Sequence, residues 1–312
     1  MKQQQHIGQV FKSTGSWYKV KLENGVLLNC RVRGKFKLEA AKVTNPVAVG
    51  DMVVIIEDEH HEGTGIIEEI KPRNNYVIRK SVHKTAHSHM LAANIDQAML
   101  VVTLKNPKTS LGFIDRFLVS TEAFRIPTIL LINKFDLYDE QDKAILSHVI
   151  DIYEPIGVRC LTISALYDQG LAKVNELLLG KTTLIAGHSG TGKSTLVNKI
   201  DSRIEQKVEA ISTFADKGVH TTTFAEMFEI GPNTLIIDSP GIKELGLADI
   251  GDHELSDYFP EMRALIGECK FHNCQHTHEP KCAIIEAVEA EEISLSRYYN
   301  YLSMLENQDN RR

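Results

Sequence analysis

Two patterns of apolar and polar positions divide the chain. Up to about residue 70, apolar residues alternate in short runs rich in β-branched residues and glycine, which predicts a small all-β domain. From residue 95, apolar runs alternate with segments of helical periodicity, which predicts a parallel sheet covered on both faces by helices. The expected strands are 98–104, 126–133, 158–163, 182–186 and 234–237, and the expected helices lie near 113–125, 139–153, 168–179 and 193–201.

One hairpin of the N-terminal domain is specified in detail by its alternation. A three-residue loop at 23–25 pairs Val20 with Leu28 and keeps the apolar faces together, whereas a two-residue Asn24-Gly25 turn would mix them. We therefore expect Gly25 to be left-handed. A cationic solvent face would suit phosphates on an oligonucleotide-binding (OB-fold) barrel, although a plain solvated face is the alternative. The inward face is Tyr18, Val20, Leu22, Val26, Leu28, Cys30 and Val32, and the candidate RNA-binding cations are Lys19, Lys21, Arg31 and Arg33.

Composition excludes several classes, and charge singles out one region. With 43% hydrophobic and 24% charged residues, the chain is neither collagen-like, coiled-coil nor wholly disordered. No apolar run approaches the roughly 20 residues of a membrane-spanning helix, and the start does not resemble a signal peptide, so we expect no membrane partner and a cytoplasmic protein. The net charge is -6, yet residues 1–50 hold nine Lys or Arg against two acids, which makes nucleic acid a candidate partner.

Residues 187–194, Gly-His-Ser-Gly-Thr-Gly-Lys-Ser, match the phosphate-loop pattern GxxxxGK[ST] between an expected strand and an expected helix. Backbone amides of such a loop surround the β- and γ-phosphates, Lys193 adds a cation, and the Ser194 hydroxyl can ligate Mg²⁺. The predicted phosphate-binding residues are Gly187, His188, Ser189, Gly190, Thr191, Gly192, Lys193, Ser194 and Thr195.

Asp238-Ser239-Pro240-Gly241 follows the apolar run 234–237, which places a carboxylate at a strand end near the same crevice. Asp238 can hold Mg²⁺ through water, and Gly241 can present its amide to the γ-phosphate. Between the two motifs, one threonine of 221–223 can close over Mg²⁺ as a first switch. The sequence does not decide which of the three threonines does so, and we take Thr222 as the candidate ligand.

The base and the catalytic group are predicted from two further features. Asn133, Lys134, Phe135 and Asp136 match NKxD, whose carboxylate accepts from guanine N1 and N2, and the Ser164-Ala165 loop matches its usual companion, with Leu166 replacing the usual lysine. Ile242 stands where many GTPases have a glutamine that orients the attacking water. His220 is the best replacement and His188 the second, because a neutral imidazole can accept a proton near pH 7, although either could simply be exposed.

The motifs occur in an unusual order. NKxD and Ser-Ala precede the phosphate loop, whereas an ordinary GTPase has them last, so the sequence predicts a circularly permuted domain with an intact site.

A cysteine and histidine cluster follows the α/β region. Cys269, Cys274, His276 and Cys282 supply three thiolates and one imidazole, enough for a closed, structural zinc site, with His272 and His278 as competing imidazoles. The other two cysteines, Cys30 and Cys160, lie in apolar strand patterns and are expected in the core.

The order NKxD, Ser-Ala, GxSGxGKS, His-Thr-Thr-Thr, Asp-Ser-Pro-Gly and then Cys-x4-Cys-x-His-x5-Cys, behind a β-barrel, resembles the bacterial small ribosomal subunit biogenesis GTPases of the RsgA/YjeQ family. The resemblance covers nearly the whole chain. It implies GTP hydrolysis stimulated by the small ribosomal subunit late in its maturation, rRNA binding by the barrel and the zinc domain, and His276 as the zinc ligand. Val219 departs from the arginine that the family often has there.

The resulting prediction is a multidomain protein: an OB-fold RNA-binding domain at 1–72, a basic connector at 73–93, a circularly permuted GTPase domain at 94–245 and a helical zinc-binding domain at 246–312. Its expected cofactors are Mg²⁺ with GTP and one structural Zn²⁺, and no feature demands more than a monomer. Two other functions stay open from the residues alone. One is a GTP-regulated RNA-binding switch that acts on another RNA or protein partner, and the other is an ATPase or nucleoside kinase, which Asn133 and Asp136 disfavour.

Overall fold

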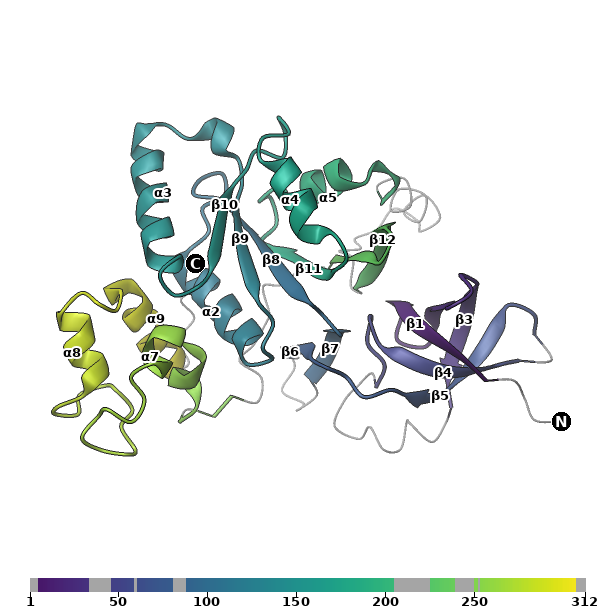
Figure 1. Ribbon diagram of the computed structural model, residues 1–312, viewed down its shortest axis with the longest axis horizontal. Helices are drawn as coiled ribbons and strands as arrows, with labels where there is room; N and C mark the ends of the chain where they lie inside the picture. The colour runs from purple at the N-terminus through teal and green to yellow at the C-terminus, as the bar shows by residue number, and fades with distance from the viewer. Residues whose placement is uncertain are drawn as a thin grey trace.

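The computed structural model describes residues 5–33, 46–58, 61–80, 88–204, 225–238, 250–251 and 253–306. A β-barrel lies at one end of an elongated molecule, a helical domain lies at the other end, and an α/β domain lies between them (Figure 1). Within those ranges, no helix has both the length and the apolar character needed to cross a membrane.

The N-terminal barrel is closed by five strands in the order β1-β2-β3-β5-β4, with β4 pairing back to β1. The hairpin prediction is confirmed, because Val20 pairs with Leu28 and Gly25 has φ +86°. Val26 is a correction: it lies in the turn, its carbonyl accepts from the Leu22 N–H, and its side chain is 47% exposed. The strands are β1 (Gln5–Ser13), β2 (Tyr18–Leu22), β3 (Leu27–Val32), β4 (Met52–Glu57) and β5 (Thr64–Ile70).

The expected irregular connector contains a small sheet, which corrects the sequence prediction. Strands β6 (Tyr76–Lys80) and β7 (Ser88–Ala93) pair antiparallel, with a register shift between Val77 and Ile78. Such an irregularity interrupts the alternation of period two on which strand prediction depends. Val77 and Ala92 are buried in the core of the α/β domain, so this sheet joins the barrel to that domain.

The central domain is a parallel sheet in the order β10-β9-β8-β11-β13, extended by the antiparallel strand β12. All five strands expected from the apolar runs are confirmed, whereas β12 was not predicted. The strands are β8 (Gln97–Val102), β9 (Thr128–Ile132), β10 (Arg159–Thr162), β11 (Thr182–Gly187), β12 (Glu226–Gly231) and β13 (Thr234–Asp238).

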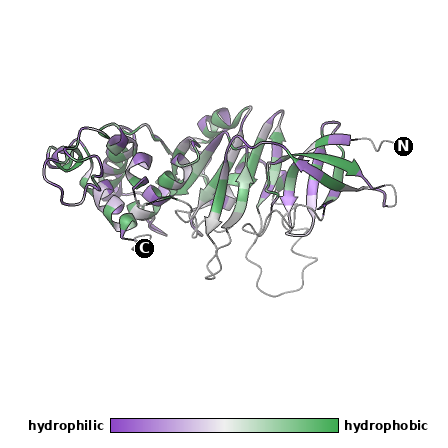
Figure 2. Cartoon of the chain, turned by 90° about the horizontal axis from the view of Figure 1, so that it is seen from below, coloured by the Kyte–Doolittle hydropathy of each residue, from purple (hydrophilic) through white to green (hydrophobic). Residues whose placement is uncertain are grey.

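Helices cover both faces of this sheet, as the alternation predicts. Helices α2 (Leu111–Glu122) and α3 (Glu140–Tyr153) pack on one face, and α4 (Leu171–Leu178) and α5 (Lys193–Ile200) pack on the other. Every residue of β8 and β11 is buried, and Figure 2 shows the hydrophobic colouring of the central strands. The carboxyl ends of the parallel strands therefore meet at one edge, where ligands bind in sheets of this kind.

The C-terminal domain packs against α2. Its own small core contains Phe259 and Tyr301, and Val119 of α2 belongs to the same apolar cluster. The predicted fold class, with its barrel, α/β domain and cysteine-rich helical domain, is thus confirmed. The elements here are η3 (Leu255–Tyr258), α7 (Pro260–Arg263), α8 (Ala283–Glu289) and α9 (Leu295–Leu305).

The barrel and the central sheet are continuous at one edge. Strand β1 pairs with β12 at Lys12 and Glu226, which joins the two sheets into one of eleven strands. Glu226 is also the cross-strand partner of Asp238, so the barrel meets the α/β domain one strand away from the predicted magnesium carboxylate.

Candidate nucleotide and metal sites

The phosphate loop joins β11 to α5, as predicted. Gly190 and Gly192 have φ of +84° and +89°, which is left-handed backbone that glycine adopts without strain. A Cβ at Gly192 would lie 2.4 Å from Asn133 Nδ2, so this position is also closed to side chains by the neighbouring loop. Thr191 is fully buried and its hydroxyl donates to the His188 carbonyl at 2.9 Å. Ser189, Ser194 and Thr195 are exposed, and their hydroxyls are thus accessible from solvent.

Lys193 and Asp238 come together at the start of α5. The ammonium group of Lys193 hydrogen-bonds the Asp238 carboxylate, and both side chains are partly exposed, at 15% and 34%. With a nucleotide bound, the phosphates would attract the Lys193 ammonium and Mg²⁺ would attract the Asp238 carboxylate. The two side chains would then no longer pair with each other. This arrangement fits a nucleotide and Mg²⁺ site with Ser194 beside it.

Asn133 connects three loops at the end of β9. Its side-chain NH₂ donates to the Thr191 carbonyl in the phosphate loop at 2.8 Å, and its Oδ1 accepts from the Ala165 N–H at 3.0 Å. The side chain is 2% exposed, so both of its polar ends are held by backbone groups away from water. The structure thus places the predicted base-reading loop and its Ser-Ala companion directly beside the phosphate loop.

A hydrogen bond fixes the orientation of the Asp136 carboxylate. Asp136 lies in the short helix η1 (Phe135–Leu137), is exposed to solvent, and accepts a hydrogen bond from the Ser164 hydroxyl. Lys134, at φ +64°, turns the chain into η1, and Phe135 is half-buried with its ring edge-on to Tyr138. An accessible carboxylate with one fixed oxygen can accept from a purine ring that offers two adjacent N–H donors.

Part of the predicted site lies outside the described residues. His220, Thr222, Gly241 and Ile242 belong to this part. His188, the second catalytic candidate, is described. Its ring packs against that of Phe113 in α2, with 3.7 Å between centroids and 33° between the ring planes.

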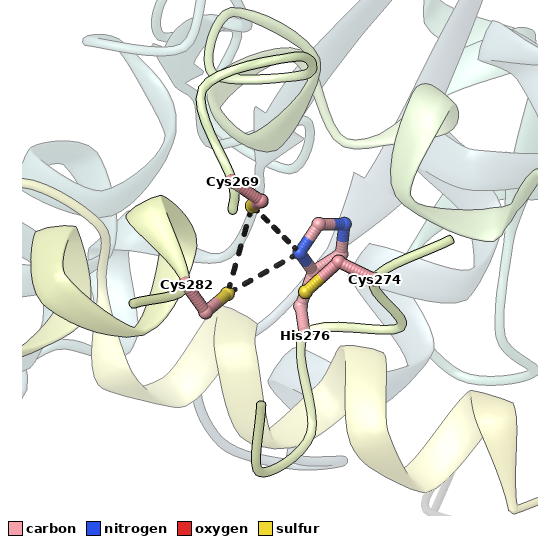
Figure 3. Close-up of side chains that lie close together, drawn as sticks. All are labelled: Cys269, Cys274, His276 and Cys282. Atoms are coloured by element: carbon pink, nitrogen blue, oxygen red, sulfur yellow. Dashed lines mark hydrogen bonds between the residues drawn. The ribbon is translucent and has the colours of Figure 1, made fainter. Parts of the chain in front are cut away.

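The four predicted zinc ligands converge in the C-terminal domain (Figure 3). The ligand atoms of Cys269, Cys274, His276 and Cys282 all lie within 4.8 Å of one another. His276 Nδ1 is 3.5 Å from Cys269 Sγ and 3.4 Å from Cys282 Sγ, and burial lowers the pKa of His276, which favours the neutral imidazole that binds metal. His272 and His278 are exposed and outside this group, so geometry selects His276. Three soft thiols and an imidazole suit zinc.

A shell of hydrogen bonds holds the ligand-bearing loop in shape. Tyr298 donates to the His276 carbonyl and Tyr301 to the Gln275 carbonyl, each at 2.7 Å. The Glu279 carboxylate accepts from the backbone N–H groups of Gln275, Thr277 and His278, and although burial alone would raise it, these donors lower the pKa of Glu279 to about 2. The loop is thus organised by groups that do not themselves bind the metal.

The four barrel cations do not form one uniform strip. Lys21 pairs with Glu229 of β12, and Arg33 pairs with Glu68 of β5. Arg31 lies over the Trp17 ring with 3.9 Å from its guanidinium carbon to the ring centroid, and Lys19 is exposed and has no acidic partner within the described ranges. Lys19 and Arg31 are therefore the cations on this face whose charge is not already paired.

The strand order, together with the site, defines the class of protein. The base-reading loop follows β9 and the phosphate loop follows β11, so the motifs run in permuted order along the chain while their side chains meet at one sheet edge. A P-loop at a strand end, an adjacent carboxylate and an NKxD loop define a circularly permuted GTPase domain.

Comparison with known proteins agrees with this class and narrows it. The family model of the RsgA GTPase matches residues 70–248, and that of the RsgA N-terminal domain matches residues 7–67. The chain belongs to the RsgA GTPase family and is a GTP hydrolase. The small ribosomal subunit biogenesis GTPase RsgA of Cytophaga hutchinsonii is 52% identical over 305 residues, covering 98% of this chain and 99% of that protein. The one from Bacteroides fragilis is 50% identical over 302 residues and 97% of each chain.

Two solved structures share the whole architecture. YjeQ from Thermotoga maritima superposes with a TM-score of 0.77 at 35% identity, covering 99% of this chain and 100% of its own. YloQ, described as a circularly permuted GTPase, superposes with a TM-score of 0.72 at 31% identity, covering 99% and 96%. The permuted order inferred from the motifs is therefore a property of the family.

Sequence reasoning missed two sets of residues: one that contacts the base-reading loop, and one that joins the α/β domain to the C-terminal domain. Tyr138, five residues after Asn133, hydrogen-bonds the base-reading loop, and no motif marks it. Asp115 and Arg297 form a buried ion pair between α2 and α9, 182 positions apart. A buried charge in each of two helices was the available signal, because an acid or an arginine on an apolar face needs a partner.

Proposed function

We propose that this protein binds the small ribosomal subunit and hydrolyses GTP in response to it during late maturation of that subunit. The observation that carries the proposal is the meeting of Lys193, Asp238 and the Asn133 loop at one sheet edge, in a chain half identical to proteins named small ribosomal subunit biogenesis GTPases. The partner comes from those relatives, and the chemistry from the site. A cytoplasmic location and a monomeric state, expected from the sequence, belong to the same proposal.

In this proposal the residues divide into four roles. The amides of 187–192 and the Lys193 ammonium bind the β- and γ-phosphates, and Asp136 with Ala165 reads guanine. Mg²⁺ would be held by Ser194, by Asp238 through water and by Thr222, and it would neutralise charge on the phosphates. Gly241 would contact the γ-phosphate, and His220 would orient the attacking water in place of the absent glutamine. Zn²⁺ at the cysteine and histidine cluster would have a structural role, because four protein ligands leave no open position.

The barrel is the domain that we propose contacts rRNA. Lys19 and Arg31 are the favoured contacts because Lys21 and Arg33 already have carboxylate partners. Arg31 stacked on Trp17 adds a planar group that could stack with a base. The C-terminal segment 246–312 has 13 acids against six Lys or Arg, so its net negative charge favours phosphate binding much less than the basic barrel does.

The experiment is steady-state phosphate release from GTP and from ATP, with and without purified small ribosomal subunits, at low and high salt. GTP-selective turnover that rises many-fold with small subunits, and rises less at high salt, is the expected result. The Lys193→Ala variant should lose nucleotide binding and turnover together. Tight GTP binding without stimulation would overturn the proposal and favour a GTP-regulated switch that acts on another RNA or protein.

A further inference from the structure

The hydroxyl of Tyr138 bridges two loops at the edge of the nucleotide site. It donates to the Asn133 carbonyl at 2.8 Å and accepts from the Leu104 N–H at 2.9 Å. Asn133 opens the base-reading loop after β9, and Leu104 opens the loop between β8 and α2. One side-chain oxygen therefore bonds the main chains of two neighbouring loops that have no motif in common.

The bridge lies at the point where two paired strands separate. The ladder between β8 and β9 ends with Val102 opposite Ile132, and the Asn133 N–H then donates to the Val102 carbonyl at 2.8 Å. Beyond this bond the backbones part. The Tyr138 hydroxyl supplies partners to a carbonyl and an N–H that the ladder no longer pairs, and it thereby fixes how far the two loops separate.

The loop that Tyr138 holds also supports the phosphate loop. Thr103 and Thr109 close it with bonds of 3.1 Å from the Thr103 N–H to the Thr109 hydroxyl and 2.8 Å from the Thr109 N–H to the Thr103 carbonyl. A Cβ at Gly190 would lie 3.3 Å from Pro107, so this loop is in close approach to the phosphate loop. The Lys134 ammonium hydrogen-bonds the Asn106 carbonyl, which adds a second link to the base-reading loop.

The environment of Tyr138 makes the hydroxyl a dependable donor. The side chain is 7% exposed and lies in the core cluster under the sheet edge, with its ring edge-on to Phe135. Burial raises the pKa of Tyr138, so the phenol keeps its proton throughout the neutral range.

We propose that Tyr138 is a positioning residue for guanine recognition, which sets the orientation of the Asn133–Asp136 loop relative to the phosphate loop. This inference rests on the base-reading role proposed above for that loop. In this role Tyr138 does not touch the nucleotide. It acts through the Asn133 carbonyl and the loop that begins at Leu104, and its loss would loosen the Asp136 carboxylate relative to the phosphates.

The test compares Tyr138→Phe with Tyr153→Phe, because Tyr153 is also buried, at 0% exposed, and its hydroxyl donates to Asp115 away from the nucleotide site. Each variant is titrated with GDP and with IDP, which lacks the amino group that guanine offers to Asp136. For Y138F we expect GDP affinity to fall roughly five- to tenfold and the preference for GDP over IDP to shrink. For Y153F we expect GDP affinity within about twofold of the parent and an unchanged preference.

Two further variants make the outcome of the experiment unambiguous. Thr109→Val removes the acceptor of the Thr103 N–H and loosens the same loop from its other end, so its GDP preference should fall even if Y138F does not fold. An unchanged preference in each folded variant of this pair overturns the positioning role. Asp136→Asn tests the base-reading role separately: if it leaves the preference for guanine unchanged, the role proposed for the loop fails, whatever Y138F does.

Discussion

The α/β domain is joined to each of its two neighbours by an ion pair, and the two pairs differ in how far they are buried. On the barrel side, Lys12 of β1 pairs with Glu226 of β12 at 2.6 Å, with the side chains 20% and 23% exposed. On the C-terminal side, Arg297 of α9 pairs with Asp115 of α2 at 2.6 Å, with the side chains 1% and 0% exposed. Both are ion pairs of similar length. Their burial differs, and burial decides what the loss of one partner would do.

Both members of the buried Arg297–Asp115 pair have further hydrogen-bond partners; we call this contact the buried joint and the Lys12–Glu226 contact the barrel joint. Arg297 also binds Glu261, while Asp115 also accepts from the Tyr153 and Asn300 side chains. Although burial alone would lower it, the carboxylates of Asp115 and Glu261 raise the pKa of Arg297, so the guanidinium stays charged. A charge held this way has no access to water when a partner is removed. The barrel joint, by contrast, can exchange either partner for solvent.

The largest effect is expected at the proposed zinc site of the C-terminal domain, the domain that supplies Arg297 to the buried ion pair. Cys282→Ser should abolish zinc binding and the cooperative unfolding of 253–306, because a closed Cys₃His site supplies much of the folding free energy of a small domain. Zinc content by atomic emission and thermal unfolding by circular dichroism are the measurements. Cys160→Ser is the control, since Cys160 is half-buried outside the cluster. Full zinc content in C282S would contradict the assigned ligands.

The next effect tests the buried ion pair itself. Arg297→Met should lower the free energy of unfolding by about 3–5 kcal/mol, because Asp115 and Glu261 would be left without their cation. Arg263→Met is the matched control: Arg263 pairs with Glu122 at 2.6 Å in the same joint but is 50% exposed, and about 0–1 kcal/mol is expected. Denaturant unfolding of both variants gives the comparison. Equal losses would show that burial is not the deciding factor.

A smaller effect is expected at the barrel joint. Lys12→Met should lower the free energy of unfolding by about 0–1 kcal/mol, and the difference from the parent should shrink at high salt because the pair is partly exposed. Urea unfolding at low and high salt measures this. Lys19→Met, on the solvent face of the same barrel, should show no such salt-dependent loss. If K12M instead lost more unfolding free energy than this, and lost it independently of salt, the Lys12–Glu226 pair would behave like the buried Arg297–Asp115 pair.

The smallest effect separates the barrel cations by their partners. Lys19→Ala should weaken binding to small subunits and reduce the slope of log affinity against log salt by about 0.7–0.9, as expected for one lost phosphate contact. Lys21→Ala should change the slope less, because Lys21 already pairs with Glu229. Equilibrium binding across a salt series measures both slopes. Indistinguishable slopes for K19A, K21A and the parent would argue against this face as the rRNA contact.

Sequence patterns predicted the central domain well because its signals are local. The strand of 182–186 was expected from a run of apolar residues and forms β11 at Thr182–Gly187, and the helix expected at 193–201 forms α5. The same reasoning missed β6, β7 and β12. A register shift interrupts the pairing of β6. Strand β12 carries two acids, Glu226 and Glu229, which pair with the barrel residues Lys12 and Lys21.

The sequence by itself determined the motifs that carry the chemistry: the phosphate loop at 187–194, the NKxD loop that precedes it, and the three cysteines of 269–282 with their candidate histidines. Each depends on residue types at fixed local spacing, because backbone geometry repeats over a few residues. Only the tertiary structure decided that Tyr138 bridges two loops, that Arg297 meets Asp115, and that Lys12 meets Glu226. These partners are brought together by the packing of distant elements, which no local period records.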